Sequence, residues 1–65
     1  MFNLYEHVRI KKNNLMGTIV DISECDGEKI FIVESDVKGK RGDGYGGDYP
    51  LYWCKEDEIL NVTNE

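Results

Sequence analysis

Hydrophobic and polar residues alternate along most of this chain, and alternation with a period of two is typical of half-buried β-strands. The alternation predicts five strands, at residues 4–11, 16–23, 29–34, 49–54 and 59–62. In the first of them, Val8 and Ile10 share one face. No long stretch has helical periodicity, and only residues 55–58 resemble a short helical turn, so the sequence predicts an all-β fold.

The second predicted strand is the most regular one. Val20 and Ile22 share one face of this strand, while Ile19 and Asp21 share the other. Because Asp21 favours water, we expect the face with Val20 to point into the core. Gly17 at the entry of the strand predicts a β-bulge or a close approach of two backbones.

A tight turn is predicted between the second and third strands. Asp26–Gly27 stands between two alternating runs, which is the strongest short-range signal for a β-hairpin. In the third strand, Phe31 and Val33 are expected in the core. Ile30 and Ile32 are then left on the outer face, where a chain end or a partner would cover them.

The fourth predicted strand, residues 49–54, contains Pro50, which has no N–H to donate and therefore belongs at the start or the edge of a strand. Leu51 and Trp53 share one face of this strand, and Tyr52 and Cys54 share the other. A chain this short has few large apolar side chains to spare, so we expect Trp53 and Leu51 to fill the core.

Residues 38–47 contain five of the seven glycines, and we expect them to form a long mobile loop. Gly42–Gly47 satisfies the pattern G-x-G-x-x-G, which binds dinucleotides when a strand precedes it and a helix follows it. Residues 48–50 do not begin a helix, so the pattern favours a linker loop over a nucleotide site.

The chain of 65 residues is expected to form one domain, residues 1–65, with no room for a large enclosed pocket. Its net charge is −5 and its pI is about 4.7. Non-specific binding to nucleic acid rests on clustered Lys and Arg, so this acidic balance disfavours it, and it disfavours an anionic membrane surface as well. No apolar run is long enough to span a membrane.

Residues 1–7 lack the charged start and apolar centre of a signal peptide, which predicts a cytoplasmic protein. Cys25 and Cys54 are then expected to be reduced thiols. These cysteines and His7 are the only strong nucleophile or metal-ligand types, and their spacing matches neither a zinc site nor a Cys-His pair. We therefore expect no catalytic residue, no metal and no cofactor.

The order of four segments resembles that of SH3-like barrels of the KOW and Tudor type. These segments are Val8–Ile10, Gly17–Ile22, Asp26–Gly27 and Phe31–Glu34. The KOW pattern also has a glycine just before an alternating strand, as Gly17 is here, although Asn14 stands where it usually has an additional glycine. The resemblance implies a small five-stranded SH3-like barrel with a long glycine-rich loop and one short helical turn, similar to small stand-alone bacterial proteins.

Two functions remain open. The first is a small non-catalytic module that binds a peptide or protein partner through aromatic and loop residues. The candidate partner-binding residues are Tyr45, Tyr49, Tyr52, Lys38, Lys40 and Arg41. The alternative, implied by the resemblance, is a KOW-like nucleic-acid or ribonucleoprotein accessory. Its basic residues would be Arg9, Lys11, Lys38, Lys40 and Arg41. A homodimer through edge strands or through Ile30 and Ile32 is also open.

Overall fold

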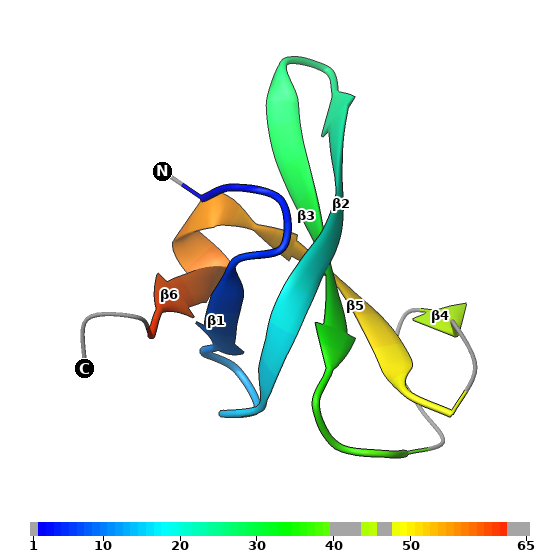
Figure 1. Cartoon of the computed structure of the whole chain (residues 1–65). Helices are drawn as coiled ribbons and strands as arrows, with labels where there is room; N and C mark the ends of the chain where they lie inside the picture. Colours follow the sequence, from blue (N-terminus) through cyan, green and yellow to red (C-terminus); the bar gives the residue numbers. More distant parts are fainter. Residues whose placement is uncertain (1, 40–43, 46–47, 63–65) are drawn as a thin grey trace.

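Antiparallel strands make up most of the computed structural model, which describes residues 2–39, 44–45 and 48–62 (Figure 1). The elements are β1 (His7–Ile10), β2 (Met16–Cys25), β3 (Glu28–Ser35), β4 (Gly44–Tyr45), β5 (Pro50–Lys55), the 3₁₀ turn η1 (Glu56–Glu58) and β6 (Ile59–Asn61). They form one sheet with the order β4-β5-β3-β2-β1-β6. The predicted small all-β fold and its single helical turn are confirmed.

Strand β4 lies inside the segment that was expected to be a glycine-rich loop. Gly44 pairs with Leu51, and Tyr45 pairs with Pro50, so this part of the segment adds a two-residue strand to the sheet. The mobile loop was predicted for residues 38–47. Of these, residues 40–43 and 46–47 lie outside the described residues.

Strand β1 begins at His7, later than the alternation predicts, because the chain before it forms a turn. Tyr5 has a φ of 68°, and the Glu6 N–H donates to the Asn3 carbonyl oxygen at 3.1 Å. The Glu6 carboxylate accepts the Asn3 N–H at 2.9 Å, which closes this turn from the other side. The turn brings the chain beside β2, where the Tyr5 N–H donates to the Ile19 carbonyl oxygen at 2.6 Å.

The predicted hairpin joins β2 and β3. Asp26 and Gly27 have φ values of 55° and 80°, which is the left-handed backbone that two-residue hairpin turns require. Cys25 and Glu28 form the pair that closes the turn. Figure 1 shows this hairpin extending beyond the other strands of the sheet.

A β-bulge interrupts the pairing of β2 with β3. Ile19 and Asp21 pair with consecutive residues of β3, so Val20 is an extra residue that has no partner of its own. The extra residue resets the alternation, so that Ile19 before it and Ile22 after it both contribute to the core. The expectation that the Val20 face forms the core is therefore wrong. The prediction assigned the two faces of the strand by strict alternation from the exposed Asp21, and a bulge interrupts this alternation.

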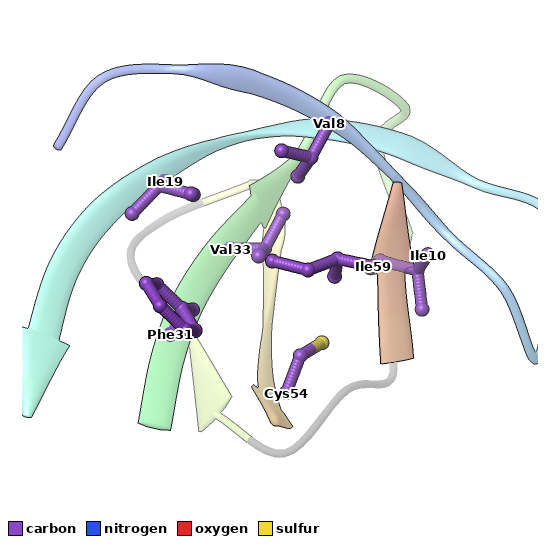
Figure 2. Packing of buried hydrophobic residues seen from close by; sticks show 7 residues of the cluster. All are labelled: Val8, Ile10, Ile19, Phe31, Val33, Cys54 and Ile59. Atoms are coloured by element: carbon purple, nitrogen blue, oxygen red, sulfur yellow. The ribbon is translucent and has the colours of Figure 1, made fainter. Parts of the chain in front are cut away.

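The buried side chains come from five strands and form one cluster (Figure 2). Its members are Val8, Ile10, Ile19, Phe31, Val33, Cys54 and Ile59. Phe2, from the chain before β1, packs on the edge of this cluster with its ring 5.8 Å from that of Phe31 in an edge-to-face arrangement. The N-terminal segment therefore helps to close the core.

Gly17 lies at a point where the backbones of β2 and β3 approach each other closely. A Cβ atom at this position would lie 2.3 Å from the Glu34 carbonyl oxygen and 2.8 Å from Cγ1 of Val33. The first of these neighbours is backbone held in the sheet, so it cannot easily move aside. The predicted close approach is confirmed, whereas the bulge lies further along the strand.

Gly17→Ala is expected to lower the free energy of unfolding by about 3 kcal/mol, because the new methyl group must displace the backbone of β3. Urea denaturation followed by circular dichroism measures this loss. Gly27→Ala is the control: nothing lies within 4 Å of its Cβ position, so only its φ of 80° opposes the change, at about 1 to 2 kcal/mol. Equal losses in the two variants would contradict the steric explanation.

The bulge makes a second prediction, about two neighbouring residues. Ile19→Ala is expected to cost about 3 kcal/mol because Ile19 is fully buried, whereas Val20→Ala is expected to cost about 1 kcal/mol or less. Thermal unfolding of the two variants gives the comparison. A larger loss for Val20→Ala would show that β2 follows the uninterrupted alternation after all.

Candidate functional site

The pairing of β3 with β5 places one row of apolar side chains on the outer face of the sheet. Directly paired residues of antiparallel strands point to the same side. Ile32 pairs with Trp53, and Glu34 pairs with Leu51, while Asp21 of β2 lies opposite Ile32 on its other side. Trp53 is thus next to Ile32 and remains 42% exposed.

The expectation that Trp53 and Leu51 fill the core is wrong. Cys54 and Tyr52, the other set of alternating residues, face inward and pair with Phe31 and Val33. Figure 2 shows the small Cys54 side chain among the core residues. The rings of Phe31 and Phe2 already supply the aromatic bulk at this end of the core, and Cys54 fits the space that remains.

We call the side chains of Ile30, Ile32, Leu51 and Trp53 the Trp53 face. The first three side chains are half-buried and Trp53 is exposed. Two of these residues lie on β3 and two on β5, so the apolar surface extends over two neighbouring strands. Its neighbours on the same side of the sheet are polar: Thr18, Asp21, Ser23, Glu34 and Lys55. An apolar centre with a polar rim is the usual anatomy of a protein interface.

A small hollow adjoins this face at the end of β3. It has a volume of about 320 Å³ and is lined by Glu34, Ser35, Asp36 and Tyr49. Glu34 belongs both to the hollow and to the rim of the Trp53 face. The half-buried Tyr49 therefore stands beside the same surface as the tryptophan.

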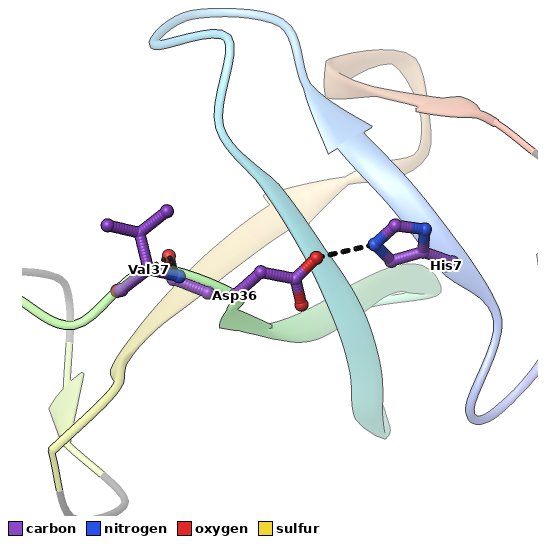
Figure 3. A network of polar contacts seen from close by, with 4 residues as sticks. His7, Asp36 and Val37 are labelled. Atoms are coloured by element: carbon purple, nitrogen blue, oxygen red, sulfur yellow. Dashed lines mark hydrogen bonds and ion pairs between the residues drawn. The ribbon is translucent and has the colours of Figure 1, made fainter.

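The chain after β3 is fixed by polar contacts (Figure 3). His7 Nε2 lies 2.6 Å from Asp36 Oδ2, which ties β1 to this segment. The buried Ser35 hydroxyl donates to the Val37 carbonyl oxygen at 3.1 Å and accepts the Val37 N–H at 3.0 Å. Asp36 is therefore fixed by the contact of its carboxylate with His7 and by the hydrogen bonds between its neighbours Ser35 and Val37.

The structure describes four of the six predicted partner-binding residues, Lys38, Tyr45, Tyr49 and Tyr52. Tyr49 lines the hollow, whereas Tyr52 packs against the core on the opposite face of β5. Tyr45 lies in β4 and pairs with Pro50, and Lys38 is exposed after β3. Lys40 and Arg41 lie outside the described residues. The sequence signal that was missed is Trp53, which had been assigned to the core.

Three of the basic residues of the nucleic-acid alternative, Arg9, Lys11 and Lys38, are described by the structure. Arg9 lies on β1, where it pairs with Met16 and Leu60, and Lys11 is exposed just after this strand. Lys38 follows β3, which is two strands away from β1 in the sheet. The contact between His7 and Asp36 joins the segment after β3 to β1, so strand order alone does not separate Lys38 from the basic residues of β1.

The nucleophile and metal-ligand types are also apart. Cys54 is buried in the core, and Cys25 is exposed at the end of β2 that is far from His7, because His7 pairs with Thr18 near the other end. In the part of the chain that the structure describes, no three His, Cys, Asp or Glu residues are grouped so as to hold a metal ion.

A second, larger hollow of about 450 Å³ lies between the hairpin and η1. Its lining includes four carboxylates and two lysines: Glu24, Glu28, Glu56, Asp57, Lys29 and Lys55. Lys55 Nζ lies 3.8 Å from Glu28 Oε2, an exposed ion pair that contributes little to stability. The carboxylates outnumber the lysines, so this end of the molecule is acidic.

Comparison with protein-family models, with curated proteins and with solved structures finds no match for this chain. None of the described segments is a helix long and apolar enough to cross a membrane.

Trp53→Thr is expected to lower the free energy of unfolding by only about 1 kcal/mol, because the indole lies on the outer face and threonine retains strand propensity. Phe31→Ala, which empties part of the core, is expected to cost about 3 to 5 kcal/mol. Urea denaturation of both variants makes the comparison. A loss at Trp53 as large as the loss at Phe31 would mean that the indole is a core residue.

Proposed function

We propose that this chain is a small non-catalytic interaction module that binds a peptide or protein partner through the Trp53 face. The observation that carries the proposal is the 42% exposure of Trp53 directly beside Ile32, on the outer side of a sheet whose inner side already forms the core. Tryptophan is among the residues most enriched at the energetic centres of interfaces.

The surroundings of Trp53 support this role. Ile30, Ile32 and Leu51 are half-buried, so a partner that covers the indole would also cover their remaining apolar surface. Asp21, Glu34 and Lys55 stand at the rim, where charged groups contribute to the choice and orientation of a partner more than to affinity.

The resemblance to SH3-like modules supports the same proposal. In the sheet, β1 pairs with both β2 and β6, and a 3₁₀ turn precedes the last strand, which is compatible with an SH3-like order of strands. On this proposal the partner is a protein, and nucleic acid is the competing ligand that the resemblance implies.

The test uses peptides selected from a random displayed library against the wild-type protein. Trp53 is the only tryptophan in the chain, so a change in its fluorescence reports occupation of the Trp53 face directly. We expect Trp53→Thr to weaken binding of the selected peptides about tenfold or more, since buried tryptophans are typical hot spots. Leu60→Thr is the matched control, because Leu60 is similarly exposed but lies on the edge strand β6.

Two outcomes would contradict the proposal. One is a set of peptides that bind the Trp53→Thr variant as tightly as the wild type. The other is tight binding of a single-stranded RNA that weakens steeply with salt, which would favour phosphate contacts and the nucleic-acid alternative.

A further inference from the structure

One edge of β2 is left open in the described structure. Strand β1 pairs with β2 only from Met16 to Thr18, and the chain before β1 adds backbone hydrogen bonds to Ile19 alone. From Asp21 to Cys25, β2 pairs with β3 on one side, and no described segment pairs with it on the other. Figure 1 shows this half of the hairpin standing clear of β1.

The hydrogen-bonding pattern shows which backbone groups face the open edge. In a two-residue hairpin the closing pair, here Cys25 and Glu28, is hydrogen-bonded, and such pairs then alternate along the ladder. Ser23 and Asp21 therefore bond to β3, whereas Ile22 and Glu24 direct their N–H and C=O groups outward. In agreement, the Ile22 N–H donates to the carboxylate of its neighbour Asp21 at 2.8 Å instead of to another strand.

We propose that the edge of β2 from Ile22 to Glu24 binds an extended basic segment of a partner protein as an additional strand. Adding a strand satisfies the outward N–H and C=O groups of both residues. The partner's backbone replaces the Asp21 carboxylate at the Ile22 N–H, and this carboxylate is then free to bind a cation. This edge is a second surface, two strands away from Trp53, and the inference does not depend on the Trp53 face.

Charge selects the occupant of the edge. Asp21, Glu24 and Asp26 are all exposed along it, and the acidic hollow beside Glu24 continues toward Glu56. A second copy of this chain, paired through the same edge, would bring two such sets of carboxylates together in a protein whose net charge is already −5. Glu24 and Asp21 point to opposite faces of the sheet, so a strand with Lys or Arg at alternate positions places its cations on one face only, beside Glu24 and the acidic hollow.

The experiment uses a short synthetic peptide in which lysine alternates with valine and threonine. A second peptide, with glutamate in place of lysine, is the charge control. Amide-resolved hydrogen exchange of the labelled protein is measured with each peptide at low and moderate salt. We expect the lysine peptide to slow exchange of the Glu24 N–H about tenfold at saturation, and the glutamate peptide to have no effect.

Two variants separate strand addition from general attraction to an acidic protein. Glu24→Pro removes the outward N–H but leaves the bonds between β2 and β3, because proline is tolerated on strand edges. Glu24→Ala removes the same charge and keeps the N–H. We expect Glu24→Pro to weaken binding at least about tenfold relative to Glu24→Ala. A lysine peptide methylated on its edge-facing backbone nitrogens makes the same test without changing the protein.

Three results would overturn this inference. In the first, the lysine peptide binds Glu24→Pro and Glu24→Ala equally, or its methylated form binds as well as the parent. In the second, exchange slows around Trp53 and not at Glu24, which leaves the proposed function standing and removes strand addition. In the third, exchange at Glu24 slows with protein concentration in the absence of peptide, which makes a second copy the occupant.

Discussion

The extra residue in β2, Val20, is the constraint on which the arrangement of the sheet depends. With it, Ile19 and Ile22 both face the core, although strict alternation would place them on opposite sides. After the bulge, Ile22 faces inward and pairs with Phe31, so Phe31 also faces inward. Because β3 also pairs with β5, the next residue, Ile32, and its partner Trp53 both face outward. A slip of one residue in β2 would therefore exchange the core and the outer surface.

The small volume of the core explains why so much apolar surface remains outside. One cluster of seven buried residues, closed by Phe2, uses the inward side of every long strand. A sheet of this size has no second layer to cover its other side, so Ile32, Leu51 and Trp53 stay partly exposed to water. Apolar surface that a single layer cannot bury is available for a partner.

Acidic side chains are placed where the sheet is open. The Asp21 carboxylate caps the Ile22 N–H on the free edge of β2, and Glu24 and Asp26 follow it toward the tip of the hairpin. Carboxylates along an exposed edge repel identical edges, which protects a small β-protein from pairing with its own copies. The same charges attract cations, so protection from self-association and the proposed selection of a basic partner rest on the same carboxylates.

The sequence by itself determined five of the six strands, the Asp26–Gly27 hairpin, the close approach at Gly17 and the burial of Val8, Ile10, Phe31 and Val33. These features follow from local alternation and turn chemistry. Only the tertiary structure decided the bulge at Val20, the outward position of Trp53 and the open edge of β2. Each of these depends on pairing between strands that are distant in the chain, and local alternation carries no information about that pairing. The candidate surfaces were therefore largely hidden from sequence reasoning, which found the aromatic residues of β5 but not the side on which they lie.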